Sequence, residues 1–220
     1  TQEDIYRDDG LNLYVYVVNN PLLWFDASGH KKQCSSDELT PEEYQRNKEE
    51  LKRMYQDFVE KKHESVKHGV NRNLIEYRVD NEDPTKVIVI KELEFDTYGN
   101  LQKKAKKGDG VTGHHMPSAD YMMKKFGVSR TDSYAMNLEQ ESPGSGGRHR
   151  RTFSYGRMPD EVKKRYFKLN ARDMLAFDLW DARRVLKEDG LWNSDARKAF
   201  SDYIKAYEEA YPEIFKKKGK

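Results

Sequence analysis

The chain has 220 residues, of which 36% are hydrophobic, 35% are charged and 12% are aromatic, and its net charge at pH 7 is +2. This aromatic content, which includes 14 tyrosines, supplies the rings for a folded core and excludes an intrinsically disordered chain. No apolar run reaches the roughly 18 residues of a membrane-spanning helix, and the single cysteine, Cys34, excludes an internal disulfide framework and a cysteine-rich zinc site.

Short β-prone runs alternate with turn signals at the start of the chain. Residues 10–16 read Gly-Leu-Asn-Leu-Tyr-Val-Tyr, and Asn-Asn-Pro at 19–21 and Asp-Ala-Ser-Gly at 26–29 indicate turns. The segment from Gln2 to Gly29 resembles the end of the Rhs/YD-repeat core, a β-shell that precedes a variable toxin domain. The resemblance implies that residues 1–33 are the end of such a core and that residues 34–220 are a C-terminal toxin domain.

A surface helix is predicted over residues 40–65. Thr40 is a favourable N-cap, Pro41 suits the first helical position, and Glu43 completes a capping box with Thr40. The apolar residues of this segment recur at helical spacing in a narrow stripe, and the other faces are charged. We therefore expect the helix to lie on the surface of the domain.

The middle of the chain predicts a small antiparallel sheet. Residues 74–79 and 86–95 are rich in β-branched and aromatic side chains, and residues 134–138 form a further short strand. Residues 103–110 read as a basic loop, and Ser118 can cap a short helix that ends at Phe126.

The last third of the chain is predicted to be helical. A long helix is expected from Pro159 to about Glu188, with a break near Asn170, and a last helix from Ser194 to about Ala210. Together these elements predict an α+β fold, a mostly helical domain with a small antiparallel sheet.

Positive charge is concentrated in residues 99–170. This segment contains 15 lysines and arginines and 7 acidic residues, so its net charge is +8. The rest of the chain is therefore acidic, at −6. A local excess of this size favours contact with a polyanion, because phosphate contacts supply most of the affinity for nucleic acid.

Three of the six histidines lie in this basic, glycine-rich region, at His114, His115 and His149. Adjacent residues on a regular strand point to opposite faces, so His114 and His115 can serve one site only at a strand end or in a bent loop. Gly113 and Pro117 indicate such a place. A neutral imidazole can act as a general base near pH 7 or hold a divalent ion, so these residues favour phosphodiester hydrolysis.

The Gly-His-His pattern followed by Pro117 resembles the HNH/endonuclease VII nucleases, also called His-Me finger or ββα-metal nucleases. The resemblance implies a ββα-metal-like nuclease centre with His115 as the catalytic base. It implies that His114 and His149 bind a divalent ion (Mg²⁺, Mn²⁺ or Zn²⁺) and that Asn137 orients the base. Pro117 lies one residue closer to the pair than in the usual motif, and no second histidine follows His149 at short spacing.

Nucleic acid is the expected substrate, with DNA favoured over RNA. Arg148, Arg150 and Arg151 are expected to hold its phosphates, because guanidinium groups pair with phosphate oxygens in bidentate fashion. The toxin resemblance implies a cognate immunity protein as a partner. It also implies secretion or delivery from the producing cell and action in the cytoplasm of a target cell.

Two other functions are compatible with this region of the sequence. A metal-independent ribonuclease toxin would use His114 or His115 as the base, His149 as the acid and Arg148 or Arg150 at the phosphate. A non-enzymatic nucleic-acid-binding module would explain the charge asymmetry but not the glycine-framed histidine pair. A zinc nucleobase deaminase is excluded, because its Cys-x-x-Cys ligand pair cannot be built from one cysteine.

Overall fold

The computed structural model describes residues 39–65, 73–79, 83–106, 108–140 and 146–215. Within these ranges the chain forms eight helices and two small antiparallel sheets, which confirms the mixed, mostly helical class predicted from the sequence. No helix in this part of the chain is long and apolar enough to cross a membrane. The predicted β-shell segment, residues 1–33, lies outside the described residues.

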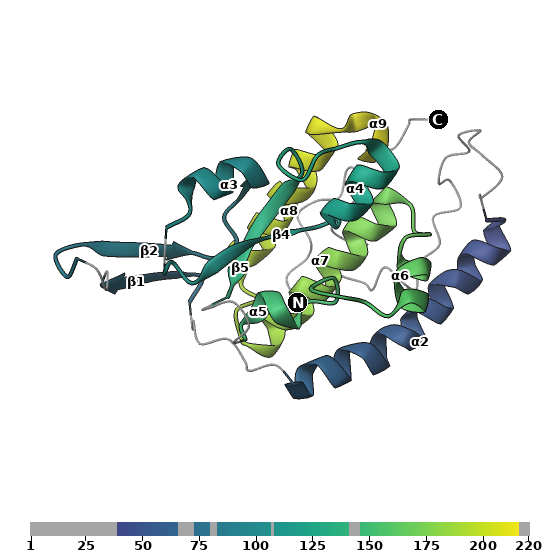
Figure 1. Ribbon diagram of the computed structural model, residues 1–220, viewed down its shortest axis with the longest axis horizontal. Coiled ribbons are helices and arrows are strands. Elements are labelled where there is room, and N and C mark those ends of the chain that lie inside the picture. The colour runs from purple at the N-terminus through teal and green to yellow at the C-terminus, as the bar shows by residue number, and fades with distance from the viewer. Residues whose placement is uncertain (1–38, 66–72, 80–82, 107, 141–145, 216–220) are drawn as a thin grey trace.

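The first described helix, α2 (Pro41–Ser65), begins as predicted and runs along one edge of the domain (Figure 1). The capping box is formed in both directions: Thr40 N–H donates to Glu43 Oε2 at 2.8 Å, and Glu43 N–H donates to Thr40 Oγ1 at 3.2 Å. Only a narrow stripe of the helix is buried, at residues such as Leu51 and Tyr55. The prediction of a surface helix is confirmed.

A hairpin of β1 (Ile75–Val79) and β2 (Val87–Lys91) projects from the body of the domain (Figure 1). The second predicted strand, 86–95, was too long. Leu93 adopts a positive φ of 66°, which breaks the extended backbone after β2. The chain then enters a different sheet as β3 (Phe95–Thr97).

The second sheet has the strand order β3-β5-β4, in which β5 (Tyr134–Glu139) pairs antiparallel with β3 and with β4 (Val111–His115). Sequence reasoning did not predict the helix α3 (Tyr98–Lys104), the end of which was assigned to a basic loop. It did predict α4 (Ala119–Phe126) between β4 and β5. Ser118 caps α4 by accepting from Tyr121 N–H, as expected.

Five helices form the C-terminal part of the domain. The predicted break near Asn170 is confirmed, since this residue ends the segment after α6 (Asp160–Tyr166) and caps α7 (Ala171–Glu188) by accepting from Asp173 N–H. The short α5 (Arg148–Arg151) comes before these helices, and α8 (Ser194–Ala210) and α9 (Pro212–Phe215) follow them.

The sheet packs on the C-terminal helices through aromatic rings. Tyr134 of β5 contacts Tyr203 and Tyr207 of α8, and Phe95 of β3 also meets Tyr203 edge to face. The hydroxyls of both α8 tyrosines donate to the carbonyl of Tyr134. This contact fixes β5, and therefore the strand β4 paired with it, against the helical core.

Candidate active site

Two antiparallel strands followed by a short helix bring the predicted site residues together. His114 lies on β4, the chain returns along β5, and His149 lies on α5; the centroids of the two imidazole rings are 4.9 Å apart. Gly147 allows this close approach, because a Cβ there would lie 2.5 Å from the carbonyl oxygen of Glu139 on β5. Its φ of +89° also suits glycine.

His114 points into the domain and is 5% exposed. Its Nε2 lies 3.3 Å from the hydroxyl of Ser154. The pKa of His114 is held well below its usual value, first by burial and then by the imidazoles of His149 and His115. The ring is therefore neutral at pH 7 and carries a lone pair that can bind a proton or a metal ion.

His149 is held by contacts on two sides. Its Nδ1 lies 2.5 Å from Gln140 Oε1, and its ring meets the ring of Tyr155 edge to face, with 4.8 Å between centroids. An amide oxygen only accepts, so Nδ1 carries the proton and the lone pair is on Nε2. Burial lowers the pKa of His149 to about 3, with smaller contributions from the nearby Lys62 and His115.

His115 is the last residue of β4 and points to the opposite face from His114, as strand alternation predicts. Its ring packs against Tyr98 of α3 with 4.7 Å between centroids, and its Nε2 lies 3.1 Å from the carbonyl oxygen of Arg130. A carbonyl only accepts, so Nε2–H donates and the basic lone pair is on Nδ1. Burial lowers the pKa of His115, opposed by this hydrogen bond and assisted by the Arg130 charge.

The predicted orienting residue, Asn137, lies on β5 opposite Gly113. Its backbone bonds to the chain around Leu93 and Glu94, which joins β5 to the segment that leads into β3. The hydrogen-bond partner of the His115 ring is the backbone carbonyl of Arg130. The sequence carries no signal for that contact, because a backbone carbonyl is present at every position.

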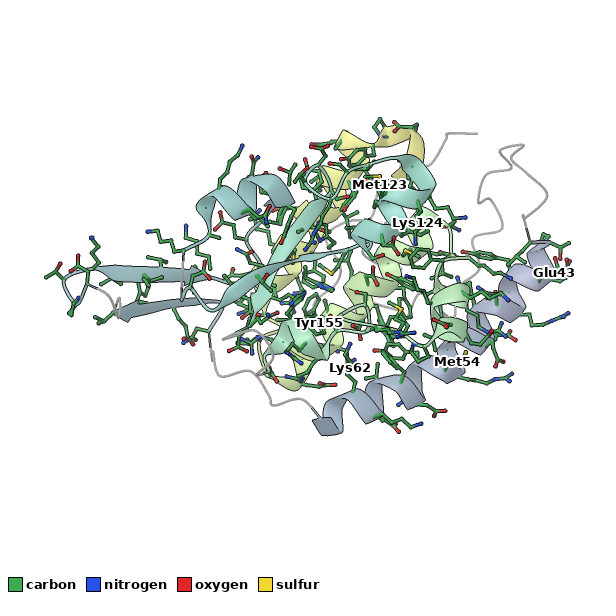
Figure 2. All side chains as sticks on the ribbon, in the orientation of Figure 1. Glu43, Met54, Lys62, Met123, Lys124 and Tyr155 are labelled. Atoms are coloured by element: carbon green, nitrogen blue, oxygen red, sulfur yellow. The ribbon has the colours of Figure 1, made fainter. Side chains whose placement is uncertain are left out.

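Sequence reasoning also missed Lys62, which reaches the site from the end of α2. Its Nζ donates to the carbonyls of Thr152 and Tyr155 at 2.6 and 2.7 Å and lies 5.5 Å from the centroid of the Tyr155 ring (Figure 2). It thereby fixes the segment that carries Ser154 and Tyr155 against the two histidines. Burial lowers the pKa of Lys62 to about 8.

The structure assigns two of the three predicted phosphate-binding arginines a different role. Arg148 and Arg151 are 0% and 1% exposed, and their guanidinium groups pair with carboxylates inside the domain. A group this deeply buried cannot also meet a nucleic-acid backbone, so the prediction for these two residues was wrong. Their partners are Glu92, Glu139 and Asp189 for Arg148, and Glu188 and Asp189 for Arg151.

Arg150 alone of the three remains half-buried, with its guanidinium carbon 5.2 Å from the centroid of the Tyr155 ring. In the described ranges no carboxylate lies within ion-pair distance of Arg150. Its charge therefore lies beside His149 without a carboxylate partner among the described residues, and its predicted phosphate contact stays a prediction.

The metal-ligand set was predicted to be His114 and His149. Among the described residues no group of three or more His, Cys, Asp or Glu side chains could hold a metal ion. The histidine pair nevertheless fits a divalent ion, because both rings are neutral and their centroids are 4.9 Å apart. Imidazole suits zinc and other transition metals, and water and phosphate oxygens would complete the coordination.

No protein-family model matches the chain, and comparisons with curated proteins and with solved structures give no significant match. Function must therefore be inferred from the geometry of the histidine site and from the two resemblances in the sequence.

Proposed function

We propose that residues 34–220 form a toxin endonuclease that hydrolyses phosphodiester bonds, with DNA as the favoured substrate and a divalent metal as cofactor. The observation that carries this proposal is the β4–β5–α5 unit, which holds the neutral rings of His114 and His149 side by side with His115 at the strand end. Two strands and a helix around paired histidines are what the ββα-metal resemblance implies.

Each side chain then has a chemical role. His115 takes a proton from a water molecule through Nδ1, and the water oxygen attacks phosphorus. The bond from phosphorus to the leaving oxygen breaks, and that oxygen takes up a proton from solvent water. His114 and His149 would hold the divalent ion, which supplies positive charge beside the scissile phosphate when bound. Arg150 contacts the backbone phosphate from the side of Tyr155.

The biological setting comes from the Rhs resemblance alone. It favours delivery of the chain from a producing cell, action in the cytoplasm of a target cell, and a cognate immunity protein that protects the producer.

A metal-independent ribonuclease is the second candidate. The observation that favours it is the Arg150 guanidinium over the Tyr155 ring, a cation beside His149 that can hold a phosphate without a metal ion. This mechanism would use His114 or His115 as the base and His149 as the acid, although burial keeps the His149 ring neutral at pH 7. Cleavage of RNA that continues in EDTA would establish this alternative.

Metal titration separates the ligands from the phosphate contact. His114→Ala and His149→Ala are each expected to weaken binding of Mn²⁺ or Zn²⁺ by about tenfold or more, because each removes a lone-pair donor. Arg150→Ala is expected to leave metal affinity unchanged, since a guanidinium has no lone pair to donate, and to weaken binding of an oligonucleotide. Isothermal titration calorimetry of the three variants measures both effects.

Unaltered metal binding in both histidine variants would remove the metal-dependent mechanism. The metal-independent ribonuclease would then be the favoured enzymatic function of this site.

A further inference from the structure

A second cluster lies on the other face of β4 from His114. The ring of Tyr98 contacts the His115 ring, and the guanidinium carbon of Arg130 lies 4.9 Å from the centroid of the Tyr98 ring. Arg130 Nη2 also donates to the Tyr98 hydroxyl at 3.3 Å. Arg130 thus makes two contacts in this cluster. Its backbone carbonyl accepts from the His115 ring, and its side chain contacts Tyr98.

Gly113 explains how Tyr98 can lie so close to β4. Residues 113 and 115 share a face of the strand, and a Cβ on Gly113 would lie 3.0 Å from Cδ2 of the Tyr98 ring and 3.2 Å from the Cβ of Ala135. The glycine of the Gly-His-His pattern therefore makes room for the ring that supports Arg130.

Arg130 differs from the buried arginines of the domain. It is exposed, and in the part of the chain that the structure describes no carboxylate forms an ion pair with it. Asp132, the acidic residue nearest in sequence, accepts from the Ser129 hydroxyl at 2.5 Å instead. A guanidinium held by an aromatic ring and open to solvent is well prepared to bind a phosphate in bidentate geometry.

We propose that Arg130 binds one phosphate of the substrate on the His115 face of β4, while Arg150 binds a second phosphate on the His149 face. The phosphodiester backbone then crosses the end of β4, between the two arginines and over the histidines. This inference rests on the proposed function, since it describes how the same site holds a nucleic-acid strand.

The test measures binding without cleavage. A fluorescein-labelled DNA oligonucleotide and its 2′-O-methyl RNA counterpart are titrated in EDTA, where neither mechanism cleaves them, at several salt concentrations. Arg130→Gln is compared with Arg150→Gln, with the double variant, and with Arg53→Gln as a control. Arg53 is an exposed arginine of α2, which lies at the opposite edge of the domain from α3 (Figure 1).

We expect Arg130→Gln to weaken binding by about 10-fold to 100-fold, as the loss of one charged hydrogen-bonded contact should. The slope of log affinity against log salt should become shallower by about 0.7–0.9, and by about twice that in the double variant. Arg130→Lys should keep most of the slope, because it keeps the charge. Equal effects of Arg130→Gln and Arg53→Gln, in proteins with the same melting temperature, would overturn the proposal.

Cleavage by the wild-type chain separates the two claims. If the wild type cleaves nucleic acid and Arg130→Gln leaves KM unchanged, the Arg130 site is wrong and the nuclease function stands. If nothing is cleaved but binding depends on Arg130 as described, the Arg130 site stands and the nuclease function is wrong.

Discussion

Replacement of His115 by alanine is expected to lower the rate of phosphodiester cleavage by about 10²–10⁴-fold, the usual contribution of a general base. The ring is half-buried at the end of β4, where it contacts Tyr98 and the Arg130 carbonyl. Its loss removes the Nδ1 lone pair from the site and little of the packed core. The rate is measured under single-turnover conditions, and circular dichroism monitors the fold.

Two further measurements distinguish a base from a merely structural residue. His115→Asn keeps an N–H donor but has no basic nitrogen, so it should be as inactive as His115→Ala. Added imidazole should restore part of the activity of His115→Ala by replacing the missing base. Near wild-type cleavage by either variant, with an unchanged circular dichroism spectrum, would show that His115 is not the base.

Arg148→Ala is expected to cost about 3–5 kcal/mol of the free energy of unfolding, the typical cost of removing one partner from a buried ion pair. Arg148 makes a bidentate contact with Glu92, with both distances 2.7 Å, and its Nη1 lies 3.4 Å from Glu139 Oε2. Both carboxylates are 0% exposed. Without the guanidinium they would remain buried beside each other with no positive charge between them.

Arg150→Ala is the matched control, because it removes the same charge two residues away. It is expected to shift the urea midpoint only slightly, since Arg150 is half-buried and contacts the Tyr155 ring rather than a carboxylate. Urea unfolding followed by circular dichroism compares the two. A stable Arg148→Ala variant that binds nucleic acid poorly would instead make Arg148 a phosphate-binding residue.

Local signals in the sequence predicted where the helices α2, α4 and α7 begin. The Thr40–Glu43 capping box, the Ser118 cap and the break at Asn170 depend on side chains that bond to backbone groups within three residues. Such contacts can be seen in the sequence itself because both partners lie in the same short segment.

Local signals also located part of the candidate site. Gly113 and Pro117 indicated a strand end or a bend at the histidine pair, and β4 does end at His115, with His114 and His115 on opposite faces of the strand. The nearness of His149 came from the family resemblance, because 34 residues separate it from His115 and no local pattern joins them.

Tertiary contacts decide what the sequence could not show. Lys62 bonds to the backbone at Thr152, 90 residues away, and only the packed domain brings them together. Arg148, Arg150 and Arg151 look alike in one basic run, yet two are buried by carboxylates from distant segments and one is not. Likewise, the end of β2 is set by the backbone of Leu93, a residue type with no preference for a positive φ.

The most direct measurement of nuclease activity is incubation of the purified chain with supercoiled plasmid DNA and with total RNA. Each substrate is incubated with Mg²⁺, Mn²⁺ or Zn²⁺ and with EDTA, and His115→Ala is run in parallel. We expect the wild type to nick and linearise the plasmid when a divalent ion is present and to be inactive in EDTA. We expect His115→Ala to be inactive under both conditions. If neither DNA nor RNA is cleaved with any of these ions, or if His115→Ala cleaves as well as the wild type, the chain is not a nuclease that depends on this histidine site.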